Sequence, residues 1–297
     1  MAVKLTLGPV LFNWAPEKWR DFYFRMADEA PVDIVYVGEV VCSKRQPFYN
    51  KLLPEVVERL QKAGKDAVLS SLAMVMNKRE AKTMRELAAN DKLPVEVNDV
   101  SALAKLDGRD HVIGPYINVY NEDTLAHLAE RGARRVCLAP EISFATAKIL
   151  STAGKKYKTD IEAQVFGRMP LAVSARCYHA RLHNLSKDNC LFVCNKDPDG
   201  LPLKTLDERG FLAVNGIQTL SAACLDLAEK MGEMQLAGIR HFRLSPHDCD
   251  MVKVATLYRQ AADGDASVAE KLRQLLPAME FSNGYFASEA GYKWISA

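Results

Sequence analysis

Short runs rich in β-branched and apolar residues alternate along this chain with longer amphipathic stretches. The sequence predicts eight strands, over Leu5 to Val10, Asp33 to Glu39, Asp66 to Leu72, Val95 to Asp99, His111 to Asn118, Arg135 to Ala139, Ile161 to Phe166 and His241 to Leu244. This alternation is typical of parallel strands joined by crossover helices. It predicts an α/β fold, a (β/α)8 TIM-like barrel. A doubly wound open sheet is the alternative, because periodicity does not reveal strand order.

The amphipathic stretches predict helices between these strands, over Pro16 to Ala30, Pro47 to Ala63, Lys78 to Ala89, Glu122 to Arg131 and Phe144 to Gly154. The second helix shows the clearest periodicity, since Leu52, Val56, Val57 and Leu60 follow one another at three- and four-residue steps. The dipeptide Ala63-Gly64 then predicts the end of that helix.

The regular spacing breaks between the seventh and eighth predicted strands. The stretch from Gly167 to Gly238 separates two elements that a single helix usually joins, and four of the seven cysteines lie in it. It also contains Asp197-Pro198-Asp199-Gly200, in which Pro and Gly predict a surface turn. We therefore expect one β/α barrel domain over residues 1–297 with a cysteine-bearing insertion at 167–238.

Charge and composition exclude several classes of partner. Lys and Arg total 39 against 37 Asp and Glu, so no long-range field attracts nucleic acid or an anionic membrane. No run approaches the roughly 18 apolar residues of a membrane helix, and Lys4 interrupts the N-terminal stretch. These features predict an unexported, cytoplasmic protein without an integral membrane segment. The odd number of cysteines fits reduced cytosolic thiols better than a disulfide framework.

Four cysteines are candidates for one site. Cys177, Cys190 and Cys194 fall within 18 residues, and the last two would share a helix face if the stretch after Ser186 were helical. Cys42 follows the second predicted strand, at the C-terminal rim where barrel active sites lie. Because the insertion leaves from the same rim, four thiolates are predicted to meet there.

Two kinds of metal suit these residues. Four thiolates match a cubane iron-sulfur cluster, whose negative charge the nearby cations could offset; these are Lys44, Arg45, Arg176, Arg181 and Lys187. The alternative is that these five side chains are solvated surface charges with no role at a metal site. Zinc is the competitor, because His179 and His183 stand at i, i+4 spacing in the same segment, although tight C-x-x-C pairs are absent. The remaining thiols, Cys137, Cys224 and Cys249, are predicted to be buried and structural.

Several short blocks make the chain recognisable. They include Leu7-Gly8-Pro9-Val10-Leu11, Gly38-Glu39-Val40-Val41-Cys42-Ser43-Lys44-Arg45 and Ser174-Ala175-Arg176-Cys177. Further blocks are Ile117-Asn118-Val119-Tyr120-Asn121, Pro140-Glu141-Ile142-Ser143, Val214-Asn215-Gly216-Ile217-Gln218-Thr219 and Arg243-Leu244-Ser245-Pro246. Together they resemble the U32 peptidase-like family. The blocks run from residue 7 to residue 246, so the resemblance covers most of the chain.

Within that family the similarity is to proteins of ubiquinone biosynthesis. The resemblance implies a [4Fe-4S] cluster on Cys42, Cys177, Cys190 and Cys194. It also implies a heterodimer with a homologous UbiU-like protein, oxygen-independent hydroxylation of a ubiquinone precursor, and a UbiT-like lipid carrier that presents this precursor. Two alternatives remain open, a non-catalytic iron-sulfur scaffold subunit and a U32-type peptidase.

One departure from the family pattern counts against proteolysis. Peptidase relatives carry a His-Gly element before the cysteine, whereas this chain reads Val165-Phe166-Gly167-Arg168-Met169-Pro170 there. No Ser or Cys has a recognisable nucleophile setting either. Other polar residues near predicted strand ends are rim candidates without an assigned catalytic role: Glu39, Asn118, Tyr120, Glu141, Arg176 and Ser245. Asn215 and Gln218 are further candidates of the same kind, although buried amides in an insertion often fix loops by hydrogen bonding.

Overall fold

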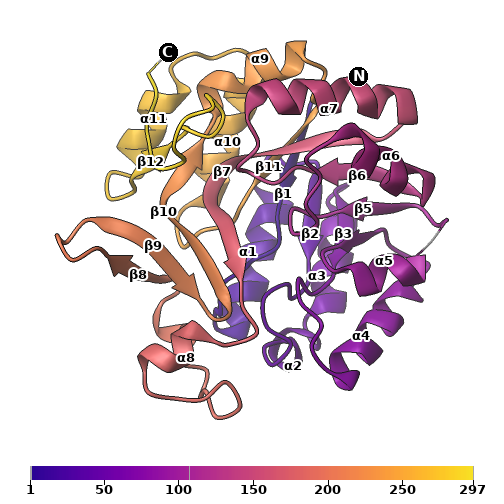
Figure 1. Cartoon of the computed structure of the whole chain (residues 1–297), viewed down its shortest axis with the longest axis vertical. Helices are drawn as coiled ribbons and strands as arrows, with labels where there is room; N and C mark the ends of the chain where they lie inside the picture. The colour runs from indigo at the N-terminus through magenta and orange to yellow at the C-terminus, as the bar shows by residue number, and fades with distance from the viewer. Residues whose placement is uncertain (1, 107, 297) are drawn as a thin grey trace.

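A closed barrel of eight parallel strands forms the body of the molecule in the computed structural model, which describes residues 2–106 and 108–296 (Figure 1). The strands are β1 (Lys4–Leu7), β2 (Ile34–Val37), β3 (Asp66–Ser70), β4 (Val95–Val97), β5 (His111–Ile113), β6 (Ala133–Cys137), β7 (Asp160–Val173) and β11 (His241–Leu244). Each pairs with the next in parallel, and β11 pairs with both β7 and β1. This closure confirms the predicted barrel and excludes the open sheet.

Helices cover the outside of the barrel. They are α1 (Pro16–Asp28), α2 (Gln46–Tyr49), α3 (Leu53–Lys62), α4 (Lys78–Ala88), α5 (Val100–Leu106), α6 (Glu122–Glu130), α7 (Phe144–Tyr157), α9 (Met231–Leu236), α10 (Met251–Ala262) and α11 (Val268–Leu275). The single helix predicted over Pro47 to Ala63 is wrong: the chain forms α2 and α3 instead. Pro54 explains the break, because a proline inside a continuous helix would lack a hydrogen-bond donor and its ring would clash with the preceding turn.

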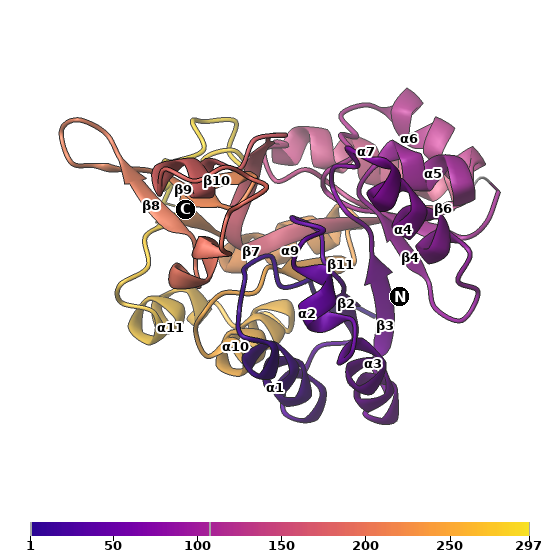
Figure 2. The same ribbon diagram turned by 90° about the horizontal axis from the view of Figure 1, so that it is seen from below.

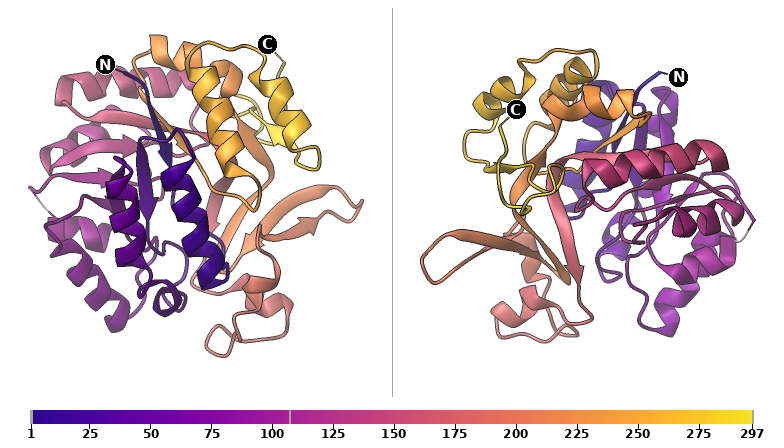
Figure 3. Two further views of the ribbon diagram at one scale, coloured as in Figure 1. Left: turned by 180° about the vertical axis from the view of Figure 1, so that it is seen from behind. Right: turned by 45° about the horizontal axis from the view of Figure 1, so that its top comes forward.

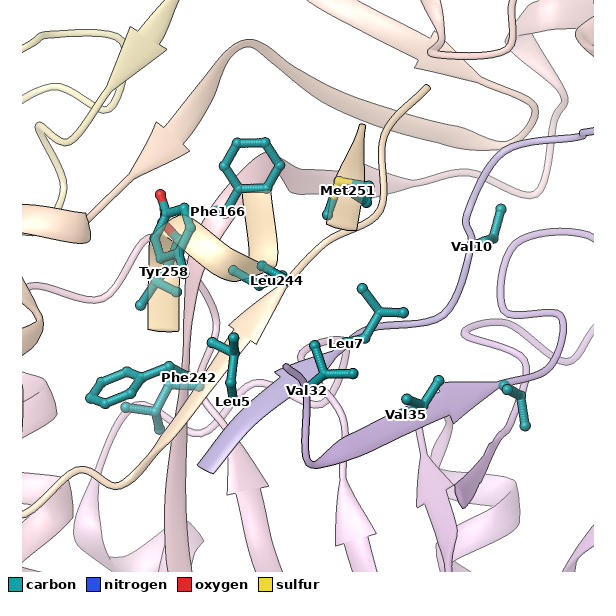
Figure 4. Packing of buried hydrophobic residues seen from close by; sticks show 14 of the residues in the cluster. Leu5, Leu7, Val10, Val32, Val35, Phe166, Phe242, Leu244, Met251 and Tyr258 are labelled. Atoms are coloured by element: carbon teal, nitrogen blue, oxygen red, sulfur yellow. The ribbon is translucent and has the colours of Figure 1, made fainter. Parts of the chain in front are cut away.

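The apolar core lies between the barrel wall and these helices. Along β1, Leu5 and Leu7 belong to this core, whereas Thr6 between them bonds to Glu162. Figure 4 shows Leu244 of β11 close to Phe166 and Tyr258, and the two aromatic rings lie 5.7 Å apart. No helix in the described residues has both the length and the apolar character needed to cross a membrane.

A network of buried ionic groups links the strands. Glu162 accepts hydrogen bonds from Thr6 (2.7 Å), from Tyr36 (2.6 Å) and from Arg243 Nε (2.7 Å). Arg243 also donates from Nη2 to Glu96 at 2.6 Å, and its guanidinium lies 4.0 Å from the centre of the Tyr36 ring. Each strand that contributes to the network is thereby tied to others far away in sequence.

The seventh strand extends beyond the barrel, whereas the sequence predicted its end at Phe166. β7 bends at Gly167, whose φ of +103° disfavours a side chain, and a Cβ there would lie 2.7 Å from the Ser245 Cβ. Its second half pairs antiparallel with β10 (Gln218–Asp226), and β9 (Gly210–Asn215) and β8 (Leu201–Lys204) extend this sheet. β12 (Phe281–Ser282) joins β10 in parallel.

The segment between β7 and β8 carries most of the candidate cysteines. It contains α8 (Tyr178–Leu182) and a 3-10 helix, η1 (Val193–Lys196). Figure 2 shows the β8–β9 hairpin projecting from the barrel, and both views of Figure 3 show the adjoining α8 segment lying beyond the barrel strands. In Figure 1, α2 and α8 lie at the same lower end of the molecule, where the barrel strands end.

Candidate metal centre

Four cysteine thiols line a single pocket at this end of the barrel. Cys42 lies in the loop between β2 and α2, Cys177 caps the N-terminus of α8, Cys190 precedes η1 and Cys194 lies within η1. The cavity between them is small, about 20 Å³. All seven cysteines of the chain are free. The structure therefore brings together the four thiols that the sequence singled out, and we call this group the cysteine cage.

The Cys42 side of the cage is held by a buried carboxylate. Glu39 Oε1 accepts the backbone N–H groups of Val41 and Cys42, each at 2.8 Å. Gly38 starts this loop with a φ of +136°, and a Cβ there would lie 2.7 Å from the carbonyl oxygen of Ser70. The Gly-Glu pair therefore fixes the direction in which the chain leaves β2 and presents Cys42.

The insertion side is held by side chains around α8 and η1. The Cys177 sulfur accepts the Ala180 amide at 3.4 Å, and Asn13 Nδ2 donates to the Cys194 sulfur at 3.4 Å. His179 Nε2 pairs with Asp197 Oδ2 at 2.8 Å. Because His179 lies two residues after Cys177, and Asp197 three after Cys194, this pair braces the two ligand-bearing turns against each other.

Cys190 and Cys194 do not share a helix face. The stretch after Ser186 is not α-helical, so the condition under which the two thiols would share a helix face is not met. Leu191 and Phe192 have φ values of 47° and 52°, in the left-handed region, which an α-helix cannot continue through. The reversal nevertheless directs both cysteines to the same pocket.

Contacts between the Cys42 loop and the insertion close the cage. Lys44 Nζ donates to the carbonyl oxygen of Lys187 at 2.5 Å and lies 3.3 Å from the carboxylate of Asp188. The ring of Phe48, in α2, packs edge-on against Phe192 at 4.8 Å. Two segments more than a hundred residues apart in sequence therefore form one enclosure.

The cations near the cysteines fall into two groups. Arg45, Lys44 and Lys187 line the pocket, whereas Arg176 and Arg181 are exposed and do not line it. Arg45 is 1% exposed. Burial alone would lower its pKa, but Cys194, Glu39 and Cys42 raise the pKa of Arg45 above its usual value. Only part of the predicted basic surroundings therefore faces the cage.

Burial favours the protonated form of two of the cage thiols, Cys42 and Cys177. It raises the pKa of Cys42, although Arg45 acts in the opposite direction. It also raises the pKa of Cys177, against the Ala180 amide. A metal or cluster must therefore displace protons as it binds, which makes its affinity rise with pH.

The histidines form a second group of possible ligands. The donor atoms of His179, His183 and Asp197 all lie within 4.8 Å of one another. Of these three residues, only His179 also lines the cysteine pocket. The described structure thus separates a possible His-His-Asp cation site from the four thiols and does not merge them into one mixed zinc site.

A family model described as peptidase family U32 matches residues 17–296. The chain belongs to family U32. The matched residues include the barrel from α1 onward, the Cys42 loop and the insertion with its three cage cysteines.

The solved structures that match this U32 chain share little sequence with it. An uncharacterized B. cereus protein is 11% identical with a TM-score of 0.42, and the match covers 82% of this chain and 61% of that one. N-acetylneuraminate lyase from Fusobacterium nucleatum is 10% identical with a TM-score of 0.48, covering 91% and 79%. The chain thus spans less than two thirds of the length of the first of these proteins.

The polar residues predicted at the barrel rim differ in burial and in their distance from the cage. Glu39 and Ser245 are buried, whereas Asn118 and Arg176 are exposed. Tyr120 donates to Glu141 near the surface, away from the residues that line the cage. The amides of Asn215 and Gln218 are buried and hydrogen-bonded: Asn215 Nδ2 donates to the carbonyl oxygen of Leu11 at 2.7 Å, and Gln218 donates to Tyr116.

A family named for peptidases invites a search for a nucleophile. Sequence reasoning missed one grouping: His247 Nδ1 pairs with Asp199 at 2.5 Å, and its Nε2 lies 3.8 Å from the Cys224 sulfur. No local spacing signals it, because β10 and the segment after β11 meet only in the fold. Cys224 is fully buried, and His247 Nε2 already accepts the Arg168 backbone N–H at 2.9 Å. This grouping therefore lacks both substrate access and a free base.

Of the three thiols predicted to be buried and structural, two are buried. Cys137 and Cys224 are fully buried, as predicted. Cys249 is half-buried, so that prediction is wrong for this residue. It follows β11 and contacts the sulfur of Met251, near an open pocket beside α1.

Proposed function

We propose that this chain is a UbiV-like iron-sulfur protein that acts in oxygen-independent hydroxylation of ubiquinone precursors. In this proposal a [4Fe-4S] cluster is held by Cys42, Cys177, Cys190 and Cys194. The observation that carries it is the convergence of these four thiols, from two distant segments, on one pocket. Family membership and the similarity of the Gly38 to Arg45 block to ubiquinone-biosynthesis proteins support it.

The residues of the cage fit such a group. Four thiols supply one terminal ligand for each iron of a cubane cluster. Arg45, Lys44 and Lys187 place positive charge around an anionic group. The Nε of Arg45 is buried and makes no hydrogen bond of good geometry with any described residue, although Cys194 is close enough to raise its pKa. A thiolate or sulfide is the kind of acceptor that this N–H lacks.

A cluster of this kind supplies one-electron transfer when it is bound. The cage offers one thiol per iron and so leaves no ligand position for a substrate, which favours electron transfer or a structural role in this subunit. The protein residues provide the surroundings. Arg45 donates to Asn215 Oδ1 at 3.0 Å, and Asn215 and Gln218 continue this chain of hydrogen bonds to Tyr116. Tyr116 lines a small cavity at the mouth of the barrel, together with Arg243.

Purification without oxygen should yield brown protein with about four iron and four sulfide ions per chain. Its visible absorption should bleach in air, because a cluster near solvent loses iron on oxidation. Cys137→Ala and Cys224→Ala are the controls, and both should keep the wild-type iron content, since their thiols lie outside the cage. Colourless protein with stoichiometric zinc would contradict the proposal, and zinc loss in His183→Ala would then assign the metal to the His-His-Asp group.

The proposed partner is a homologous UbiU-like protein, with a UbiT-like carrier presenting the lipid. Apolar side chains are exposed beside the cage, including Tyr178, Leu182 and Leu191. Exposed groups of this kind mark protein interfaces. Light scattering of the two chains mixed at micromolar concentration should give the mass of a heterodimer, and Leu191→Asp should weaken binding by about tenfold (~1.4 kcal/mol).

Leu236→Asp is the matched control for this surface. Leu236 is also exposed but lies in α9, at the opposite end of the molecule from α8 in Figure 1. This variant should bind as wild type. Monomers alone in every mixture would contradict the heterodimer.

A further inference from the structure

Arg45 occupies an unusual position for a charged side chain. Its guanidinium is almost fully buried, yet it lines the cysteine pocket. Nη1 donates to the carbonyl oxygen of Leu11 at 2.8 Å, and Nη2 donates to Asn215 Oδ1 at 3.0 Å. Both acceptors are neutral. These bonds hold the planar group between the loop after β1, the Cys42 loop and β9.

The charge of Arg45 is only loosely paired. The nearest carboxylate oxygen, Glu39 Oε1, lies 4.0 Å away and already accepts two backbone N–H groups. Arg243 offers a contrast within the same chain, because its two carboxylate partners lie at 2.6 and 2.7 Å. Arg45 is therefore not neutralised by a close carboxylate, and it lines the same pocket as the thiols of Cys42 and Cys194.

We propose that Arg45 is a positioning residue that sets the reduction potential of the cluster held by the cysteine cage. This inference rests on the proposed function. One-electron reduction adds a negative charge to the group that the thiolates bind. A fixed buried cation stabilises the more negative state more strongly, because surroundings of low polarity screen the interaction poorly. Hydrogen bonds to cluster sulfurs act in the same direction, and the buried Nε of Arg45, which makes no hydrogen bond of good geometry with the described residues, belongs to a side chain that lines the same pocket as Cys194.

Gly216 is part of the same arrangement. It has a φ of +64°, and a Cβ at this position would lie 2.9 Å from Arg45 Nη2. The turn between β9 and β10 therefore leaves room for the guanidinium at the wall of the cage. A shorter or mobile cation would not be held in this way, which explains why arginine suits this position better than lysine.

The test is a redox titration of the full chain carrying its cluster, followed by visible absorption and by electron paramagnetic resonance. Arg45→Gln should shift the equilibrium towards the oxidised form by about tenfold, equivalent to a midpoint potential lower by ~59 mV. Arg45→Lys should give a smaller shift in the same direction. Arg181→Gln removes a cation from the same region, but from an exposed side chain outside the pocket, and should leave the potential unchanged.

An Arg45→Gln protein with a full cluster and an unchanged potential would overturn the inference. If that variant binds no iron, Arg45→Lys decides in its place, and an unchanged potential then overturns it. A wild-type protein that holds no iron-sulfur cluster would instead contradict the proposed function, and this result is distinct from a cluster whose potential is unchanged in the variants.

Discussion

Replacing any one of Cys42, Cys177, Cys190 and Cys194 by alanine is expected to remove most of the bound iron. A cubane cluster needs a ligand on every iron and loses affinity sharply when one thiolate is missing. The barrel should remain folded, because three of these cysteines lie in the segment after β7 and the fourth lies in a loop, away from the main apolar core. Circular dichroism should stay close to wild type while iron content and anaerobic quinone hydroxylation fall together.

Cys224→Ala is the matched control for these four variants, because Cys224 is a thiol buried outside the cage. It should keep its iron. A cage variant that kept its full cluster and lost only activity would identify that cysteine as a participant in the chemistry and not a ligand. A cluster-free variant with full activity would show that this chain has no redox role.

The substitution Arg243→Met should lower the free energy of unfolding by about 3–5 kcal/mol, the usual cost of breaking a buried ion pair. Arg243 is the shared partner of Glu162 and Glu96, and both carboxylates are fully buried. Methionine has a comparable length but no charge, so both carboxylates would lose their closest cation. Urea unfolding followed by circular dichroism measures the change.

Arg134→Met provides the control for this prediction. Arg134 pairs with Asp110 at 2.7 Å, but both side chains are largely exposed, so the loss should be about 0–1 kcal/mol. Adding Glu96→Gln to Arg243→Met should recover part of the stability, because it removes one unpaired charge. A loss as small as that of Arg134→Met would show that the interior network is not needed for stability.

The stability of the protein at acidic pH should also depend on the buried ionic network around Glu162. Burial alone would raise the pKa of Glu162, but Arg243 and Arg135 lower it to about 2. Because this pKa is depressed in the folded protein, ionised Glu162 contributes stability above the ordinary glutamate pKa of ~4.3. That stability is lost as the pH falls from there towards 2. In Arg243→Met the pKa of Glu162 rises, so the acid-induced loss should begin at a higher pH.

Local sequence patterns located most of the barrel. The strand predicted over His241 to Leu244 is β11 to the residue, and the helix predicted over Phe144 to Gly154 begins where α7 begins. The end of β7 was misplaced because Gly167 and Pro170 usually end a strand. Here Gly167 permits close approach to Ser245, and Pro170 lies opposite Leu220 in the outer sheet. Pairing partners far along the chain therefore overrode a local signal.

For the cysteine cage, too, the sequence predicted some features and only the fold decided others. Cys42 could be placed at the rim because it follows a strand, and Cys177, Cys190 and Cys194 because they follow the next-to-last barrel strand. Which cations accompany them could not be predicted, since Arg45 and Arg181 are both polar and both close to a cysteine in sequence. Only the fold buries Arg45 against Leu11 and Asn215 and leaves Arg181 in solvent.

The sequence by itself determined the number of barrel strands, four of the helices between them and the end of the barrel at which four thiols gather. These features follow from hydrophobic periodicity and from the direction of parallel strands, which act over a few residues at a time. Only the tertiary structure decided that β11 closes on β7, that His179 pairs with Asp197 at the edge of the cage, and that Arg45 is buried beside the thiols. Each of these depends on contacts between residues distant in sequence, and the free energy of such contacts is set by burial and geometry that no local pattern encodes.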